Sequence, residues 1–126
     1  SPGFAITRSV AIKFDLINDA GAFRSSMGLY RDGAAPTANN ALNGEVALDP
    51  LGINLQSGNP LNVTLAYSSG SLSVTVIEDA AGATPVTRAF PVDIPGTVGN
   101  MGHVGFTAAT GFVTANFDVL DWDFVS

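Results

Sequence analysis

Apolar and polar residues alternate along much of the chain. The first such stretch carries an apolar residue at every second position, at Val10, Ile12, Phe14 and Leu16. Successive side chains of a β-strand point to opposite faces of the sheet, so a period of two is typical of a strand with one buried face. We therefore predict a half-buried strand over residues 10–16.

The middle of the chain predicts a β-hairpin. Apolar residues alternate over 61–67 and again over 72–76, and Ser68-Ser69-Gly70 between them has the composition of a tight turn. Residues 79–85, rich in alanine, glycine and threonine, predict a second turn, which leads into a strand over 86–92. Strands joined by short turns indicate antiparallel sheets.

The last third predicts a turn over 95–100 and then two more core strands, because apolar residues alternate over 104–108 and over 120–124. Residues 34–48 lack alternation and contain Pro36 and Gly44, so we predict a long loop there. No stretch has the period of a helix. Short strands with glycine- and proline-rich turns favour an antiparallel β-sandwich over an α/β fold.

Composition narrows the classes of function. The chain has 126 residues, of which 46% are hydrophobic and 13% charged, so we predict one globular domain over residues 1–126. It has no cysteine, which excludes thiol catalysis, cysteine-bound zinc and iron–sulfur clusters. A net charge of −6 excludes nucleic acid as a partner, since the protein would repel a phosphate backbone.

The chain carries no apolar run of 18 residues, so we expect no insertion into a membrane. It begins with Ser-Pro-Gly rather than with methionine, which leaves room for a cleaved leader or an upstream domain. The domain over 1–126 is therefore either complete or a fragment of a longer domain.

Three segments together resemble the legume-type lectins and their bacterial lectin-like relatives. They are Ser9-Val-Ala-Ile-Lys-Phe-Asp15 with Met27-Gly28-Leu29, the hairpin over 61–78, and Val104-Gly-Phe-Thr-Ala-Ala-Thr-Gly111 with Leu120-Asp-Trp-Asp-Phe124. The resemblance implies an all-β fold, the concanavalin A-like jelly-roll antiparallel β-sandwich. It covers nearly the whole chain but only the C-terminal half of a full family domain.

In the family, several loops form a shallow site for a sugar. The resemblance places Asn18 and Asp19 in one of these loops, and Thr110, Gly111 and Phe112 in another. An aspartate that the family supplies from its N-terminal half has no counterpart here, so the chain holds part of the site. Phe112 has two interpretations: its ring stacks on a sugar, or it closes the core beneath the loop.

Family members place a transition metal and calcium beside the sugar. Lys13 stands where the family has a ligand glutamate and Ser26 where it has a ligand histidine, so we expect no transition metal. Asp15 is retained, and with Asn18 and Asp19 it could supply some of the six to eight oxygens that calcium requires. The alternative for these three residues is turn chemistry, in which Asn and Asp bond to their own backbone.

The acidic residues Asp118, Asp121 and Asp123 raise the alternative of a glycoside hydrolase. Such an enzyme needs two carboxyl groups across a cleft, one of them with a raised pKa. The only glutamates, Glu45 and Glu78, lie far apart in the sequence. We therefore predict that the protein is not an enzyme and that the aspartates keep an outer face soluble.

The sequence thus predicts a non-catalytic carbohydrate-binding module of a secreted or cell-surface, bacterial protein, with a glycan as its partner and calcium as the one metal to test. The main alternative is a structural or adhesive β-sandwich that has lost sugar binding; a hydrolase-related domain comes third. A half-domain would leave an open apolar face and unpaired sheet edges. We expect the chain's own strands, a second copy as a homodimer, or an upstream segment to complete the sandwich.

Overall fold

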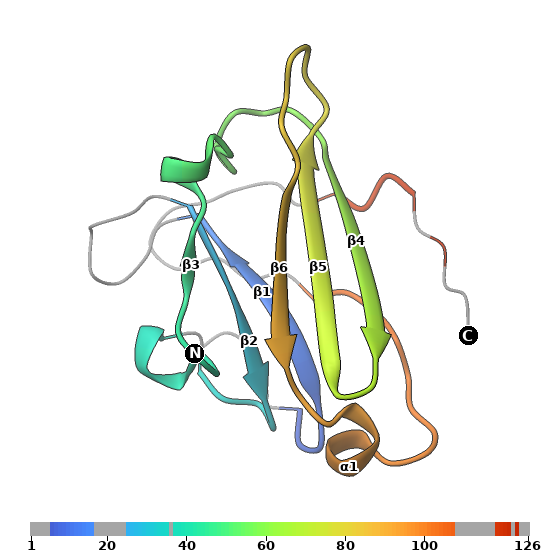
Figure 1. The fold of residues 1–126 in the computed structure, drawn as a ribbon. Helices are drawn as coiled ribbons and strands as arrows, with labels where there is room; N and C mark the ends of the chain where they lie inside the picture. Colours follow the sequence, from blue (N-terminus) through green and yellow to red (C-terminus); the bar gives the residue numbers. More distant parts are fainter. Residues whose placement is uncertain (1–5, 17–24, 36, 108–117, 122, 124–126) are drawn as a thin grey trace.

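The computed structural model describes residues 6–16, 25–35, 37–107, 118–121 and 123. These residues form two three-stranded antiparallel sheets that lie face to face (Figure 1). Within the described residues, no helix is long and apolar enough to cross a membrane. The predicted all-β sandwich architecture is confirmed.

The first sheet has the order β1-β2-β3 and the second the order β4-β5-β6. The strands of the first sheet are β1 (Val10–Asp15), β2 (Ser26–Arg31) and β3 (Val46–Ala47). The strands of the second are β4 (Leu61–Ser68), β5 (Ser71–Glu78) and β6 (Val86–Pro91). Every pair of neighbouring strands is antiparallel, as predicted. The structure also confirms the hairpin over 61–78, and the strands predicted over 10–16 and 86–92 each differ from β1 and β6 by one residue at the end.

The hairpin between β4 and β5 turns on two residues with positive φ. Ser69 has φ 49° and Gly70 has φ 80°, the combination that a type I′ turn requires. This turn has the same twist as the strands that it joins, and the eight residues of β4 pair with the eight of β5, from Leu61 opposite Glu78 to Ser68 opposite Ser71. The register fixes which face of each strand turns inward.

The core lies between the two sheets. The first sheet contributes Met27 and Leu29, both fully buried. The second sheet contributes apolar side chains from alternate positions of β5 and β6, and the segments after β3 and β6 add a few more. The buried apolar cluster consists of Met27, Leu29, Leu48, Ile53, Leu72, Val74, Val76, Val86, Phe90 and Val92.

The described parts of the connections contain three short helices. The predicted loop over 34–48 is irregular for most of its length, with the 3₁₀ turn η1 (Ala38–Asn40) and the two residues of β3 within it. A second 3₁₀ turn, η2 (Asp49–Leu51), follows. One prediction is wrong here: residues 94–98 form the short helix α1 (Ile94–Val98) rather than a turn, because the Asp93 side chain caps its start by accepting a hydrogen bond from the Gly96 amide at 3.0 Å.

The two C-terminal strands are a second correction. Residues 101–107 and 118–121 belong to no strand, and the side chains of Val104, Phe106 and Leu120 are all exposed. Ala108, Trp122 and Phe124 lie outside the described residues. Alternation marks the face that a strand would bury, but a strand forms only by pairing with a neighbour. The described part of this segment pairs with none.

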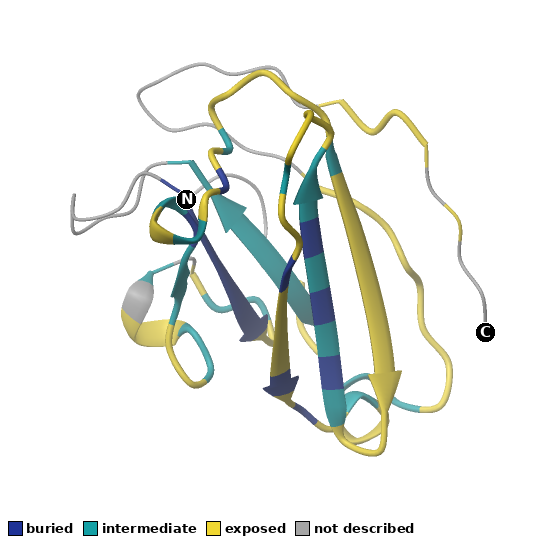
Figure 2. Cartoon of the chain, turned by 45° about the horizontal axis from the view of Figure 1, so that its top comes forward, coloured by how far each residue is buried: buried dark blue, intermediate teal, exposed yellow. Residues whose placement is uncertain are grey.

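Among the strands that the structure describes, β4 is an edge of its sheet, and its apolar side chains are open to solvent. Val63, Leu65 and Tyr67 lie opposite the buried Val76, Val74 and Leu72 of β5, so all six share the inward face. We call Val63, Leu65 and Tyr67 the β4 stripe. Although they face inward, their side chains are 39%, 54% and 38% exposed. Figure 2 shows the contrast between the exposed β4 and the alternately buried β5.

Candidate functional site

The predicted sugar-binding residues lie largely outside the described part of the chain. Asn18 and Asp19 fall in the segment 17–24, and Thr110, Gly111 and Phe112 fall in 108–117, both outside the described residues. Asp15, the last residue of β1, is described and partly buried. The assignments of the first five residues to a sugar site, and of Asp15, Asn18 and Asp19 to a calcium site, therefore remain predictions.

Two side chains with oxygen atoms lie together at the end of β1. Asp15 pairs with Ser26 of β2, so their side chains lie on the same face of the first sheet. Ser26 is 1% exposed, and its Oγ is buried with no hydrogen-bond partner among the residues that the structure describes. A buried hydroxyl without a partner costs free energy.

No group of three or more His, Asp or Glu side chains in the described part of the chain is placed to hold a metal. The aspartates Asp118, Asp121 and Asp123 are exposed, and so is His103, which lies in no strand.

Lys13 has a structural role that sequence reasoning missed. Its Nζ donates a hydrogen bond to the Ala34 carbonyl at 2.6 Å and lies 4.7 Å from the centroid of the Tyr30 ring. The Tyr30 hydroxyl in turn donates to Glu45 Oε1 at 3.0 Å. Burial lowers the pKa of the Lys13 ammonium. The lysine thus ties β1 and β2 to the loop that follows them.

Gly28 makes room for this arrangement. A Cβ atom at Gly28 would lie 3.0 Å from Cε2 of the Tyr30 ring, which is tighter than ordinary contact, so the ring lies across the glycine. Gly28 also pairs with Lys13 in the antiparallel register. The signal in the sequence was the pair Gly28 and Tyr30 on alternate positions of β2, but its meaning depends on the register.

Glu78 holds the loop before β4. Its carboxylate accepts hydrogen bonds from the Asn54 amide at 2.5 Å, Ser57 Oγ at 3.3 Å and Asn59 Nδ2 at 3.4 Å. The Asn54 backbone bond, followed by the Asn59 side chain, lowers the pKa of Glu78. A glutamate with a lowered pKa is ionised at neutral pH, so it is poorly suited to donate a proton to a glycosidic oxygen.

The sign of this pKa shift predicts a pH dependence. Because the folded pKa of Glu78 lies below its unfolded value, the stabilisation is present above the ordinary glutamate pKa and is lost as pH falls through the folded pKa. Glu78→Gln should therefore lower the melting temperature at neutral pH and have little effect in strong acid. Thermal melts at several pH values check this. Glu45→Gln is the control, and an equal loss at every pH would contradict the prediction.

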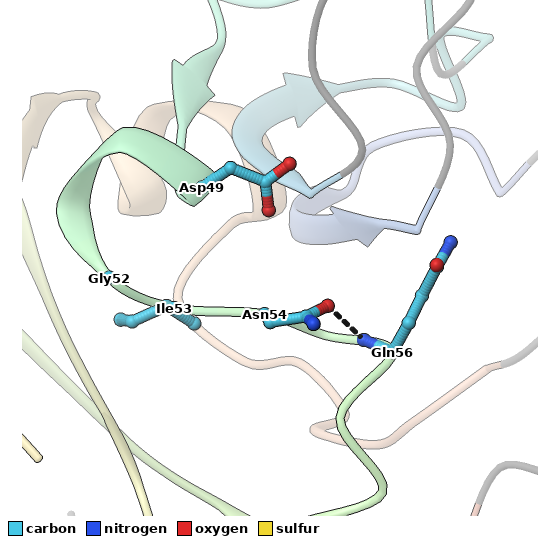
Figure 3. A pocket seen from close by; sticks show the side chains of 5 residues that line it. All are labelled: Asp49, Gly52, Ile53, Asn54 and Gln56. Atoms are coloured by element: carbon cyan, nitrogen blue, oxygen red, sulfur yellow. Dashed lines mark hydrogen bonds between the residues drawn. The ribbon is translucent and has the colours of Figure 1, made fainter.

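A polar hollow lies beside this loop. It is lined by Asp49, Gly52, Ile53, Asn54 and Gln56 and has a volume of about 360 Å³ (Figure 3). A second hollow of about 250 Å³ shares Gly52 and Ile53 with it and reaches Glu78 and residues 80–84. Sequence reasoning missed both, because Asn54 and Gln56 have no periodic pattern that separates them from any polar loop.

Two antiparallel sheets packed over one core, with long loops at their ends, define a β-sandwich of the lectin type. The family model of the legume lectin domain matches residues 3–126, nearly the entire chain. The chain therefore belongs to the legume lectin family. This membership gives it a lectin-like, carbohydrate-binding class of function, in a family that generally binds metal ions such as calcium. A comparison with curated protein sequences found no match.

Proposed function

We propose that the chain is a non-catalytic carbohydrate-binding module of a secreted or cell-surface, bacterial protein. The observation that carries the proposal is the legume lectin match over residues 3–126, on a chain whose described strands form the two sheets of a sandwich. Secretion is consistent with the class of function, since glycans are displayed mainly outside cells. The bacterial origin rests on the resemblance of three sequence segments alone.

We assign the sugar contacts to Asn18 and Asp19 in one loop and to Thr110, Gly111 and Phe112 in the other. Calcium, where bound, is assigned to Asp15, Asn18 and Asp19. The Ser26 hydroxyl beside Asp15, which has no hydrogen-bond partner among the described residues, supports a cation at this end of β1. Calcium bound there would order the loop that carries two of the sugar contacts.

The test compares this chain with a longer form that carries the upstream half of a family domain. We expect weak or undetectable binding of mannose, galactose or chitobiose by the chain alone and measurable binding by the longer form. Each lost hydrogen bond to a sugar forfeits about 1 kcal/mol, and 1.4 kcal/mol is about tenfold in affinity. Titration calorimetry with and without calcium gives the dissociation constants.

In the longer form, Phe112→Ala should weaken sugar binding by roughly 3- to 10-fold, because an aromatic stack contributes about 0.5–1.5 kcal/mol. Phe106→Ala is the matched control, since Phe106 is exposed and precedes the proposed loop. If neither form binds any sugar, the chain is instead a structural or adhesive sandwich that has lost its site. Turnover of glycosides that Asp121→Asn abolishes would favour the hydrolase alternative.

We also propose that a second copy of the chain pairs with the edge strand β4 and brings its own β4 stripe beside this one. Edge strands usually carry charges that prevent pairing with other chains, but β4 has none over its eight residues. Two copies of β4 paired antiparallel about a two-fold axis would keep both stripes on one face of a continuous sheet. The alternative occupant is an upstream segment of a longer chain.

A further inference from the structure

The hollow beside η2 takes no part in the sugar site proposed above. Its lining residues come from η2 and the loop that follows, between the two sheets along the chain. Figure 3 shows the side chains of Asp49, Asn54 and Gln56 around the same open space. The lining contains two amides and one carboxylate, and no aromatic ring.

The backbone beneath the hollow is fixed by burial and hydrogen bonds. The Ile53 side chain is 2% exposed, and its amide donates to the Leu48 carbonyl at 3.1 Å. The Leu55 amide donates to the buried Ser25 Oγ at 3.0 Å. The Asn54 amide donates to Glu78, as described above. A site held in this way loses little conformational freedom when a ligand binds.

The polar side chains are also held, but each keeps a group for a ligand. Asn54 Oδ1 accepts the Gln56 amide at 2.9 Å, while its Nδ2 amide bonds to none of the residues that the structure describes. Gln56 Nε2 donates to the Leu16 carbonyl at 3.0 Å, which leaves its Oε1 as an acceptor.

We propose that this hollow binds one unit of a neutral saccharide through its hydroxyl groups. A hydroxyl both donates and accepts, and the hollow presents a donor at Asn54 and an acceptor at Gln56. Its volume of about 360 Å³ lies at the lower end for small-molecule sites. One carboxylate is too few for calcium, which takes six to eight oxygens. The adjoining hollow across Gly52 offers room for a second unit.

The choice of a saccharide as the ligand rests on the proposed function, but the residues that line the hollow differ from those assigned to the sugar site. Gln56 bonds to Leu16, two positions before Asn18 in the first proposed sugar loop. The hollow is therefore joined by a hydrogen bond to the described residue that precedes that loop in the sequence. Oligosaccharides long enough to reach both places should bind more tightly than single sugars.

The test uses the isotope-labelled chain titrated with chitobiose and mannobiose to tens of millimolar. Nuclear magnetic resonance follows the side-chain amide signals of Asn54 and Gln56, which we expect to shift. Asn54→Asp keeps the Oδ1 acceptor for the Gln56 amide but removes the Nδ2 donor, so the loop keeps its cap while the shift at Gln56 should require about tenfold more sugar. Asn39→Asp makes the same change of charge at an exposed residue elsewhere and should leave the titration unchanged.

Equal titrations for Asn54→Asp and Asn39→Asp would overturn the proposal. A second result would also overturn it: the signals of segments 17–24 and 108–117 shift on addition of sugar, while those of Asn54 and Gln56 do not. The latter result would leave the proposed function intact. Shifts at Asn54 and Gln56 that persist in Phe112→Ala, with none in those two segments, would support the hollow and contradict the sugar site of the proposed function.

Discussion

Leu29→Ala should lower the free energy of unfolding by about 2–5 kcal/mol, the cost typical of a buried leucine truncated in a core. Leu29 lies in the middle of β2 and is 0% exposed. It belongs to the apolar cluster that joins the two sheets, and its carbonyl accepts the Leu42 amide at 2.9 Å. The cavity would therefore open where the two sheets and the loop after β2 meet.

Leu65→Ala makes the same substitution on the β4 stripe and is the matched control. Leu65 is 54% exposed, so its truncation should cost less than about 0.5 kcal/mol in dilute solution. Urea denaturation followed by the fluorescence of Trp122 gives both values. A loss at Leu65 as large as that at Leu29 would mean that the stripe is already buried in solution.

Leu65→Lys should raise the dissociation constant for self-association by at least about tenfold. In the paired edges, a lysine at the centre of each β4 stripe would bring two like charges close together and remove apolar contact between the copies, and 1.4 kcal/mol suffices for a tenfold change. Analytical ultracentrifugation over a range of protein concentrations measures the constant. The expected result is a dimer of the natural sequence and a monomer of the variant at the same concentration.

Thr64→Lys is the control for that experiment. Thr64 neighbours Leu65 on the same strand, is exposed, and points to the opposite face of the sheet. The lysine in Thr64→Lys adds the same charge without touching the β4 stripe, so the dimer should persist. If the natural sequence stays monomeric at every concentration, a second copy is not the occupant, and the upstream segment of a longer chain becomes the explanation.

The hairpin could be predicted from the sequence because its signals are local. The alternation of apolar and polar residues predicted both strands. The turn needs two residues with positive φ, and Ser69 and Gly70 have them. The helix α1 could not be predicted from the sequence, because Pro95 and Gly96 indicate a turn by composition. In the structure the Gly96 amide donates to the Asp93 side chain, and the Thr97 and Gly99 amides donate to backbone carbonyls four residues earlier, so the segment is helical.

The prediction of two C-terminal strands was wrong for a reason that is not local to the segment. The alternation at Val104 and Phe106 is as regular as that of β4, yet neither residue is in a strand. Alternation is a property of one segment, while strand formation depends on a neighbour whose position the sequence does not state. The legume lectin family was recognisable because its segments keep their order along the chain, whatever pairs with them.

The candidate sites show the same limit. Asp15 could be singled out from the sequence, but the buried Ser26 hydroxyl beside it depends on the register of β1 and β2. The contacts of Glu78 with Asn54, and of Lys13 with Ala34, join residues more than twenty positions apart. Such pairs follow from tertiary packing and have no periodic signature.

The meander of β4, β5 and β6 also has a consequence for the order of folding. Its described strands pair with neighbours in the sequence, through short connections, whereas the core between the sheets gathers residues as distant in sequence as Leu29 and Phe90. Closing a short loop costs less chain entropy than closing a long one, and hairpins form in about 1–10 μs. The meander therefore has the topology of a folding nucleus, a template on which the first sheet condenses late.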